Sequence, residues 1–90
     1  MDTKYDDDNV DIQHIADEGT KIYRQIKSQY EDTKRGKFLA IEIDSKDVFL
    51  GDTGGEAMEL AEIKYPDKVF FVVKIGFDTI AKMAHSFINN

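Results

Sequence analysis

The sequence predicts an α+β domain in which a small sheet carries helices, in the order helix, strand, strand, helix, strand and a C-terminal element. Three observations predict it: a long helical stripe of apolar residues, two short alternating segments around a polar turn, and an uninterrupted apolar segment near position 70. The chain has 90 residues, enough for one modest core. We therefore expect a disordered acidic tail over residues 1–9, a single domain over 10–76, and a C-terminal element of that domain over 77–90.

The first helix is expected from Ile12 to about Lys34. Gly19 is unfavourable inside a helix and Thr20 is a good N-cap, so a break or a new start of the helix is expected at this point. Gly36 supplies the left-handed conformation that ends it. The apolar positions fall at steps of three or four on one stripe: Ile15, Gly19, Ile22, Ile26 and Tyr30.

A β-hairpin is expected next, with its turn at Ser45 and Lys46. This turn sets Ile43 opposite Val48 and Ile41 opposite Leu50. The same register opposes Asp44 and Asp47, an unfavourable like-charge pair, so the loop is expected to open to four residues. One face of the hairpin is expected to take the helices: Leu39, Ile41, Ile43, Val48 and Leu50.

The second helix is predicted by the capping-box spacing of Thr53 and Glu56, in which Glu56 reaches back to the Thr53 amide. Pro66 ends this helix. The residues expected to be buried are Ala57, Leu60, Ala61 and Tyr65.

The third strand, 69–75, is apolar on both faces, which is typical of an interior strand. A helical crossover makes it parallel to the second strand and antiparallel to the first, which gives the sheet order 2-1-3. The C-terminal segment is ambiguous. A helix from Asp78 is slightly preferred, whereas a fourth strand would cover an exposed edge. The residues that fit the helix are Ile80, Met83, Ala84 and Phe87.

Several short segments of Thr20 to about Phe87 carry a family resemblance. They are Gly36-Lys37-Phe38-Leu39-Ala40-Ile41, Val48-Phe49-Leu50-Gly51-Asp52-Thr53, Pro66-Asp67-Lys68 before Phe70-Phe71, and Ile75-Gly76-Phe77. The chain thereby resembles a widespread family of small prokaryotic domains of unknown function. The resemblance implies no catalytic residues. Members of that family are encoded beside retropepsin-like proteases or in small paired operons, which implies a protein partner.

The charge and the cysteine content of the chain restrict the classes of function that it can have. Eighteen acidic and twelve basic residues give a formal charge of −6, which disfavours a nucleic-acid ligand. The one basic cluster, Lys34, Arg35 and Lys37, lies at a predicted helix end, where cations offset the helix dipole. The absence of cysteine excludes disulfides and thiol chemistry. The acidic N-terminus has no apolar run and is read as neither a signal peptide nor a membrane anchor, so a cytoplasmic location is expected.

The triplet Asp52-Thr53-Gly54 resembles the active-site triplet of an aspartic protease. That chemistry needs two aspartates sharing one proton across a dimer, in an all-β body with a mobile flap. Here the triplet leads into Glu56 and an alanine-rich helix, so helix capping explains it better. A hydrolase that uses Asp52 is kept as the alternative function.

Other sites are weaker. Asp44, Asp47 and Asp52 do not have the spacing of an EF-hand and are read as solvated turn residues. His14 and His85 have no nucleophile signature nearby and are read as surface or rim residues. Two further ideas are disfavoured by the acidic surroundings. They are an anion site at Gly51, Gly54 and Gly55, and an RNA-stacking platform at Phe38, Phe49, Phe70 and Phe71.

The sequence therefore predicts a non-enzymatic protein–protein interaction module without a cofactor or metal. It is expected to self-associate as a homodimer or to pair with a protein encoded nearby. Phe38 and Phe49 lie on the second face of the hairpin and need a cover, which a second subunit can provide. Ile22 and Ile26 of the long first helix complete the candidate interaction surface.

Overall fold

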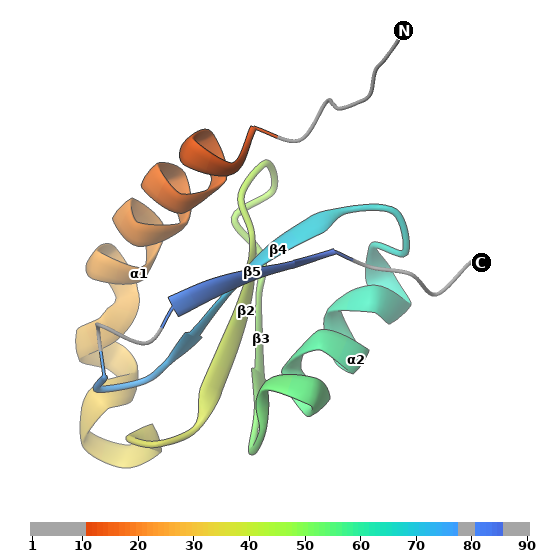
Figure 1. Cartoon of the computed structure of the whole chain (residues 1–90). Helices are drawn as coiled ribbons and strands as arrows, with labels where there is room; N and C mark the ends of the chain where they lie inside the picture. Colours follow the sequence, from red (N-terminus) through yellow and green to blue (C-terminus); the bar gives the residue numbers. More distant parts are fainter. Residues whose placement is uncertain (1–10, 78–80, 86–90) are drawn as a thin grey trace, which may run out of the picture.

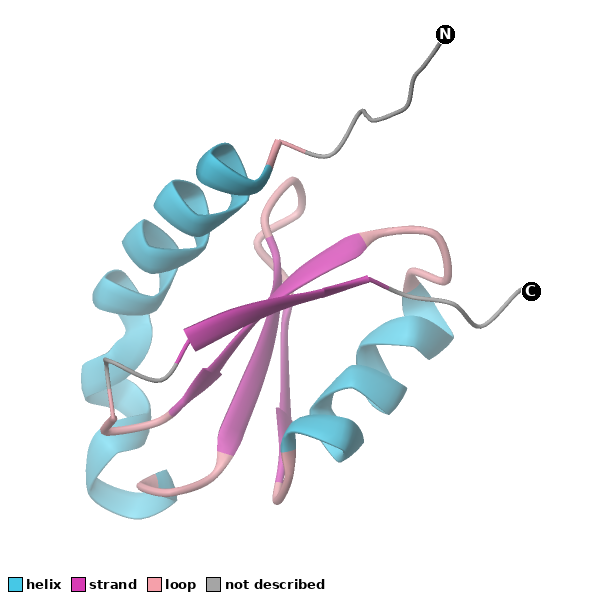
Figure 2. Ribbon diagram, viewed as in Figure 1, coloured by secondary structure: helices cyan, strands magenta, loops and turns pink. Residues whose placement is uncertain are grey.

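The computed structural model describes residues 11–77 and 81–85. Figures 1 and 2 show one twisted sheet with a helix against each face. The sheet has the order β3-β2-β4-β5, and every pair of neighbouring strands is antiparallel. This arrangement confirms the predicted α+β class and the order 2-1-3 of the first three strands. In chain order the elements are α1 (Ile12–Lys34), β2 (Phe38–Glu42), β3 (Val48–Gly51), α2 (Gly54–Lys64), β4 (Val69–Lys74) and β5 (Ala81–His85).

The two helices cover opposite faces of the sheet, which corrects the prediction that one face takes both. Residues alternate between faces along a strand, so each strand contributes to two cores. The core under α1 is formed by Ile15, Ile22, Tyr23, Leu39, Ile41, Phe71, Val73 and Ile75. The core under α2 is formed by Ala40, Ala57, Ala61, Phe70 and Val72, with Phe38, Phe49, Met58 and Tyr65 packed against it.

The C-terminal segment contributes a strand, so the slight preference for a helix is wrong. β5 pairs with β4 from Val69 opposite His85 to Val73 opposite Ala81. Pairing satisfies the backbone groups along β4 that a helix would have left without ladder partners. The rest of the predicted helix, at residues 78–80 and 86–90, lies outside the described residues.

The hairpin register differs from the prediction by two residues. Ile41, not Ile43, lies opposite Val48, and Leu39 lies opposite Leu50. The connecting segment is wider because the Glu42 N–H donates to the Asp47 carbonyl at 2.9 Å, and Lys46 adopts a positive φ of 66°. The faces are nevertheless as predicted, because a shift of two residues keeps every side chain on its side.

α1 runs without interruption through Gly19 and Thr20, which corrects the expected break or start at this point. Asp11 caps its start by accepting a hydrogen bond from the His14 N–H at 3.1 Å. A Cβ atom on Gly19 would lie only 2.3 Å from Cγ of Phe71, so the glycine allows the helix to approach β4 closely. Gly36 ends the helix region at a φ of 90°, as predicted.

α2 begins with the expected cap, in which the Thr53 hydroxyl accepts from the Glu56 N–H at 3.0 Å. Glu56 itself accepts from the Asp52 N–H at 2.8 Å, one residue before the predicted Thr53 amide. Ala57 and Ala61 are buried, but Leu60 is exposed, which corrects its assignment to the core. Ala57 and Ala61 form the stripe of α2 that packs on the sheet, and Leu60 lies off this stripe.

Candidate interaction surface

Asp52 of the protease-like triplet is an exposed, ion-paired carboxylate. It interacts with the Nζ of Lys37, and 68% of its side chain is exposed. The hydrogen bond from Lys37 holds the pKa of Asp52 below its ordinary value. A carboxylate held charged in this way suits a structural ion pair, whereas a shared-proton aspartate dyad requires one carboxyl group with a raised pKa.

The other turn aspartates also have lysine partners. Asp44 lies 3.0 Å from the Nζ of Lys68, and Asp47 lies 2.9 Å from the Nζ of Lys64. The Tyr65 hydroxyl also donates to Asp47, at 2.6 Å. Hydrogen bonds from Lys64 and then Tyr65 lower the pKa of Asp47. In the described residues, no group of three or more potential ligands gathers where it could hold a metal ion.

Two backbone amides that flank the glycine turn at the start of α2 already have partners within the protein. The Asp52 N–H binds Glu56, and the Glu56 N–H binds Thr53. Charged Asp52 and Glu56 also border the turn. The glycine turn at Gly51, Gly54 and Gly55 therefore presents acidic groups where an anion would bind.

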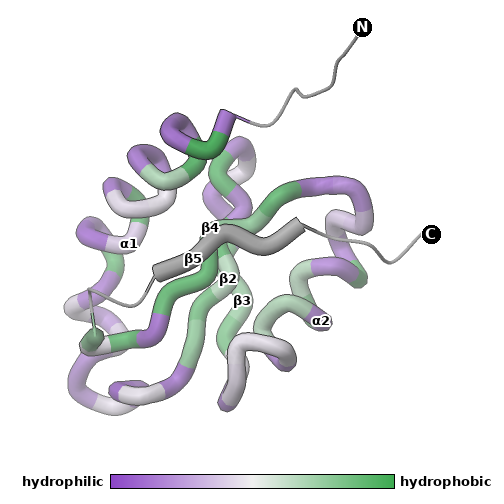
Figure 3. The backbone as a smooth tube through the Cα atoms, viewed as in Figure 1, coloured by the Kyte–Doolittle hydropathy of each residue, from purple (hydrophilic) through white to green (hydrophobic). Residues whose placement is uncertain are grey.

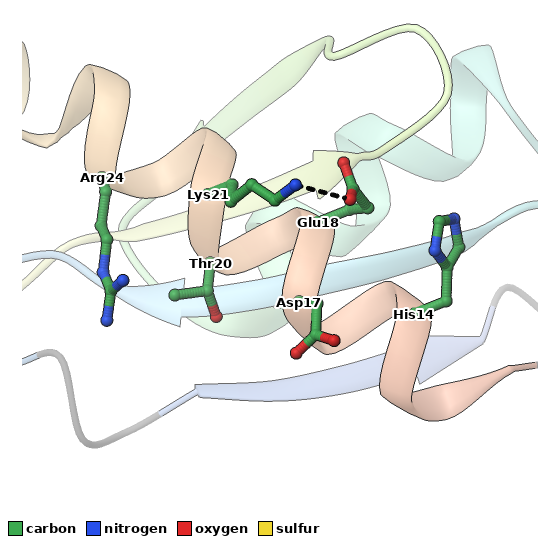
Figure 4. A pocket seen from close by; sticks show the side chains of 6 residues that line it. All are labelled: His14, Asp17, Glu18, Thr20, Lys21 and Arg24. Atoms are coloured by element: carbon green, nitrogen blue, oxygen red, sulfur yellow. Dashed lines mark ion pairs between the residues drawn. The ribbon is translucent and has the colours of Figure 1, made fainter.

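A shallow polar depression runs along the outer side of α1 (Figure 4). Lys21 and Glu18 form an ion pair of 3.1 Å there, and exposed His14 lies at one end. Its described lining comes from this one helix: His14, Asp17, Glu18, Thr20, Lys21 and Arg24. The mixture of charges along a solvated helix face indicates no particular ligand. The side chain of His85 lies outside the description.

Of the four residues predicted to form an interaction surface, Ile22 is buried and the other three are partly buried against the two cores. Ile22 is only 6% exposed and belongs to the core under α1, and Ile26 packs against that core. Phe38 and Phe49 pack against the core under α2. The rings of Phe49 and Tyr65 contact each other edge-on, with their centroids 6.2 Å apart. Phe70 and Phe71 are buried as well, so these phenylalanines form no open stacking platform.

Large exposed apolar side chains occur elsewhere. Leu60 is 48% exposed and Ile63 is 73% exposed, both on α2. Three residues apart, they are neighbours on the helix surface. Phe77 is also exposed, but Lys74 and Arg35 lie 4.7 and 5.1 Å from its ring centre and form cation–π contacts with it. Figure 3 shows hydrophobic residues along β2, β3 and β4 and again on α2.

Leu60 belongs to a row of α2 side chains that reaches toward β3. It is the middle member of the row Glu56, Leu60 and Lys64, whose members are four residues apart. Glu56 binds the Asp52 amide after β3, and Lys64 binds Asp47 before β3. Because the ends of the row contact the two ends of β3, Leu60 lies beside the middle of that strand.

The outer edge of β3 has no strand partner among the described residues, since β3 stands at the end of the sheet order and pairs with β2. The four residues from Val48 to Gly51 carry no charge and no proline, the features that usually block such an edge. We name the combination of this edge with Leu60 and Ile63 the β3–α2 surface.

Comparison with known proteins gives no assignment. A scan against protein-family models, a search of curated proteins and a search of solved structures each find no match to this chain. The family resemblance of the hairpin therefore stays a prediction.

A transmembrane helix is not found in the described part of the chain, where no helix combines sufficient length with sufficient apolar character.

Sequence reasoning missed the β3–α2 surface because it assigned Leu60 to the core and left Ile63 out. A signal was present. Ala57 and Ala61 are small residues four positions apart, a spacing typical of the helix face that packs on a sheet. Leu60 and Ile63 lie off that stripe.

Proposed function

We propose that this protein is a non-enzymatic interaction module that binds through the β3–α2 surface, and that its partner is a second copy of the same chain. The observation that carries the proposal is the exposure of Leu60 and Ile63 on the helix beside β3, whose outer edge has no strand partner among residues 11–77 and 81–85. Exposed apolar side chains that gather at one place mark interaction sites more often than scattered ones. The acidic composition is consistent with a protein partner in the cytoplasm rather than with nucleic acid.

The hydrolase that uses Asp52 receives no support from the geometry. Its carboxylate is paired with Lys37 and its pKa is lowered. Its neighbours Thr53 and Glu56 are occupied in capping α2.

Light scattering on the purified full chain over a range of concentrations tests the proposal. We expect the mass to rise from 10.3 kDa, the mass of one chain, to twice that value. The double substitution Leu60→Asp with Ile63→Asp should keep the chain monomeric. Ile12→Asp is the matched control, because Ile12 is another exposed isoleucine, 60% exposed, at the start of α1.

A wild-type chain that stays monomeric at every concentration would overturn self-association. A dimer that survives in the double variant would show that the β3–α2 surface is not the contact. If the chain is monomeric and a tagged copy retains a different protein at equal stoichiometry from its native host, the partner in the proposal is wrong.

A further inference from the structure

We infer that two copies of the chain pair in antiparallel orientation through the outer edges of β3, about a two-fold axis at Phe49, so that the two sheets become one. This inference rests on the proposed function and adds the geometry of the contact. The symmetry is that of an isologous dimer, in which the same patch serves both copies.

The hydrogen-bond pattern decides which backbone groups of β3 are available. In an antiparallel ladder, residues alternate between bonding to one neighbour and pointing to the other side. The Glu42 N–H donates to the Asp47 carbonyl at 2.9 Å, so this pair bonds across the hairpin. By alternation, Phe49 bonds to Ala40 on β2, whereas Val48 and Leu50 direct their N–H and C=O groups outward.

The bonding between β2 and β4 supports the same alternation from the other side. The Ile75 N–H donates to the Lys37 carbonyl at 2.8 Å. Counting along β2 from Lys37, its odd-numbered residues bond toward β4 and its even-numbered residues toward β3. Ala40 therefore faces β3, in agreement with the hairpin.

One register satisfies both outward-facing residues within the strand. An axis at Phe49 places Val48 opposite Leu50 of the second copy, so these residues exchange hydrogen bonds on each side of the axis. The two Phe49 residues then face each other as a non-hydrogen-bonded pair. An axis between Phe49 and Leu50 is excluded, because it would set residues of different faces opposite each other, whereas opposed residues of an antiparallel ladder share a face.

The row of side chains on α2 is also complementary to its own copy under the two-fold axis at Phe49. α2 runs opposite in direction to β3, and its row of Glu56, Leu60 and Lys64 reaches from one end of the strand to the other. A two-fold axis turns the second row around. Leu60 then meets Leu60 of the second copy, and Glu56 lies toward Lys64 of that copy. Ile63 extends the apolar contact beside them.

Charge complementarity also favours this register at the ends of the strand. It brings Lys46 to the level of Asp52 of the second copy, which is a pair of opposite charge. Both side chains are exposed in the monomer, where Asp52 pairs with Lys37, so Lys46 would bring a second cation to that carboxylate. An unrelated partner would not be expected to match both the strand edge and the helix row in this symmetric way.

Single-cysteine variants of the full chain test the register, because the natural sequence has no cysteine to interfere. A non-hydrogen-bonded antiparallel pair has its Cα atoms about 4.5 Å apart, within the range of a disulfide. Phe49→Cys should therefore form a cross-linked dimer under mild oxidation. Val48→Cys or Leu50→Cys alone should give about tenfold less cross-linked dimer than Phe49→Cys. In each of these variants the two cysteines would occupy diagonal positions, which are about 7–8 Å apart.

Mixing provides the second measurement, with milder substitutions in case Phe49→Cys fails to fold. Val48→Cys combined with Leu50→Cys should cross-link between the two variants, since these positions oppose each other. Circular dichroism checks the fold of each variant. Cross-linking in this pattern supports the register, whereas equal cross-linking at all three positions, or none at any, overturns it.

These outcomes separate the two proposals. If Leu60→Asp with Ile63→Asp dissociates the dimer but no cysteine cross-links as expected, the β3–α2 surface stands and the strand pairing is wrong. If the wild-type chain is monomeric throughout, both are wrong.

Discussion

The two helices cover the sheet by different means. α1 packs through large side chains such as Ile15, Ile22 and Tyr23, and nearly all of that apolar surface is buried. α2 packs through Ala57 and Ala61 and keeps Leu60 and Ile63 on its outside. A helix that buries its small residues and exposes its large ones has apolar surface left for a partner. The comparison therefore assigns stability mainly to the α1 side and association to the α2 side.

The largest expected effect distinguishes isoleucines on the two helices. Ile22→Ala should lower the free energy of unfolding by about 2–5 kcal/mol, because it leaves a cavity in the core under α1. Ile63→Ala should change it by no more than about 0.5 kcal/mol at concentrations where the chain is monomeric. Urea denaturation measures both. Equal losses for the two variants would contradict the division between the helices.

The next effect concerns glycines in helices. Alanine normally stabilises a helix relative to glycine by about 1 kcal/mol. Gly19→Ala should instead destabilise the protein by about 1–3 kcal/mol, because its Cβ would clash with the buried ring of Phe71.

Gly55→Ala in the first turn of α2 is the matched control. A Cβ there has only the Thr53 hydroxyl oxygen nearby, at an ordinary 3.8 Å, so stability should stay level or rise. A stabilising Gly19→Ala would show that α1 does not approach β4 as closely as described.

A smaller effect is expected at the start of α2. Thr53→Ala removes the hydroxyl that accepts from the Glu56 N–H and should cost about 1 kcal/mol. Thr53→Ser keeps the oxygen and should retain most of that stability. Thermal unfolding of the two variants side by side provides the measurement, and identical midpoints would exclude the cap as a source of stability.

The smallest effect is the pH dependence of the ion pair that joins Lys64 of α2 to Asp47 in the turn before β3. The Lys64 hydrogen bond lowers the pKa of Asp47 below its ordinary 3.8. Its stabilising contribution is therefore complete above pH 3.8 and is lost as the pH falls through the lower folded value. Asp47→Asn should be less stable than wild type at neutral pH, and this difference should shrink in acid.

Unfolding at neutral pH in high salt provides the control, because salt screens exposed charges. A difference between wild type and Asp47→Asn that persists unchanged well below pH 3.8 would assign the effect to something other than this charge.

Local sequence patterns predicted most of the fold. The capping pair Thr53 and Glu56, the left-handed Gly36 and the interior strand around Phe70 depend on interactions near in sequence or on burial from both sides. The hairpin register was missed because Lys46 in the turn adopts a positive φ, and a lysine gives no sequence signal for this conformation.

The candidate site was less predictable because its features depend on tertiary structure. Whether Leu60 is buried depends on the angle at which α2 meets the sheet, and whether β3 is an edge depends on strand order. β5 was ambiguous for a related reason, since the pairing that favours a strand over a helix comes from distant β4.

Hydrogen exchange of the β3 amides, followed by NMR at low and high protein concentration, tests the central claim most directly. Phe49 should be protected at both concentrations, because its N–H bonds to β2. Val48 and Leu50 should exchange freely in the monomer and become protected as the dimer forms. Val48 and Leu50 amides that stay unprotected at concentrations where the mass has doubled would contradict the pairing of the two β3 edges.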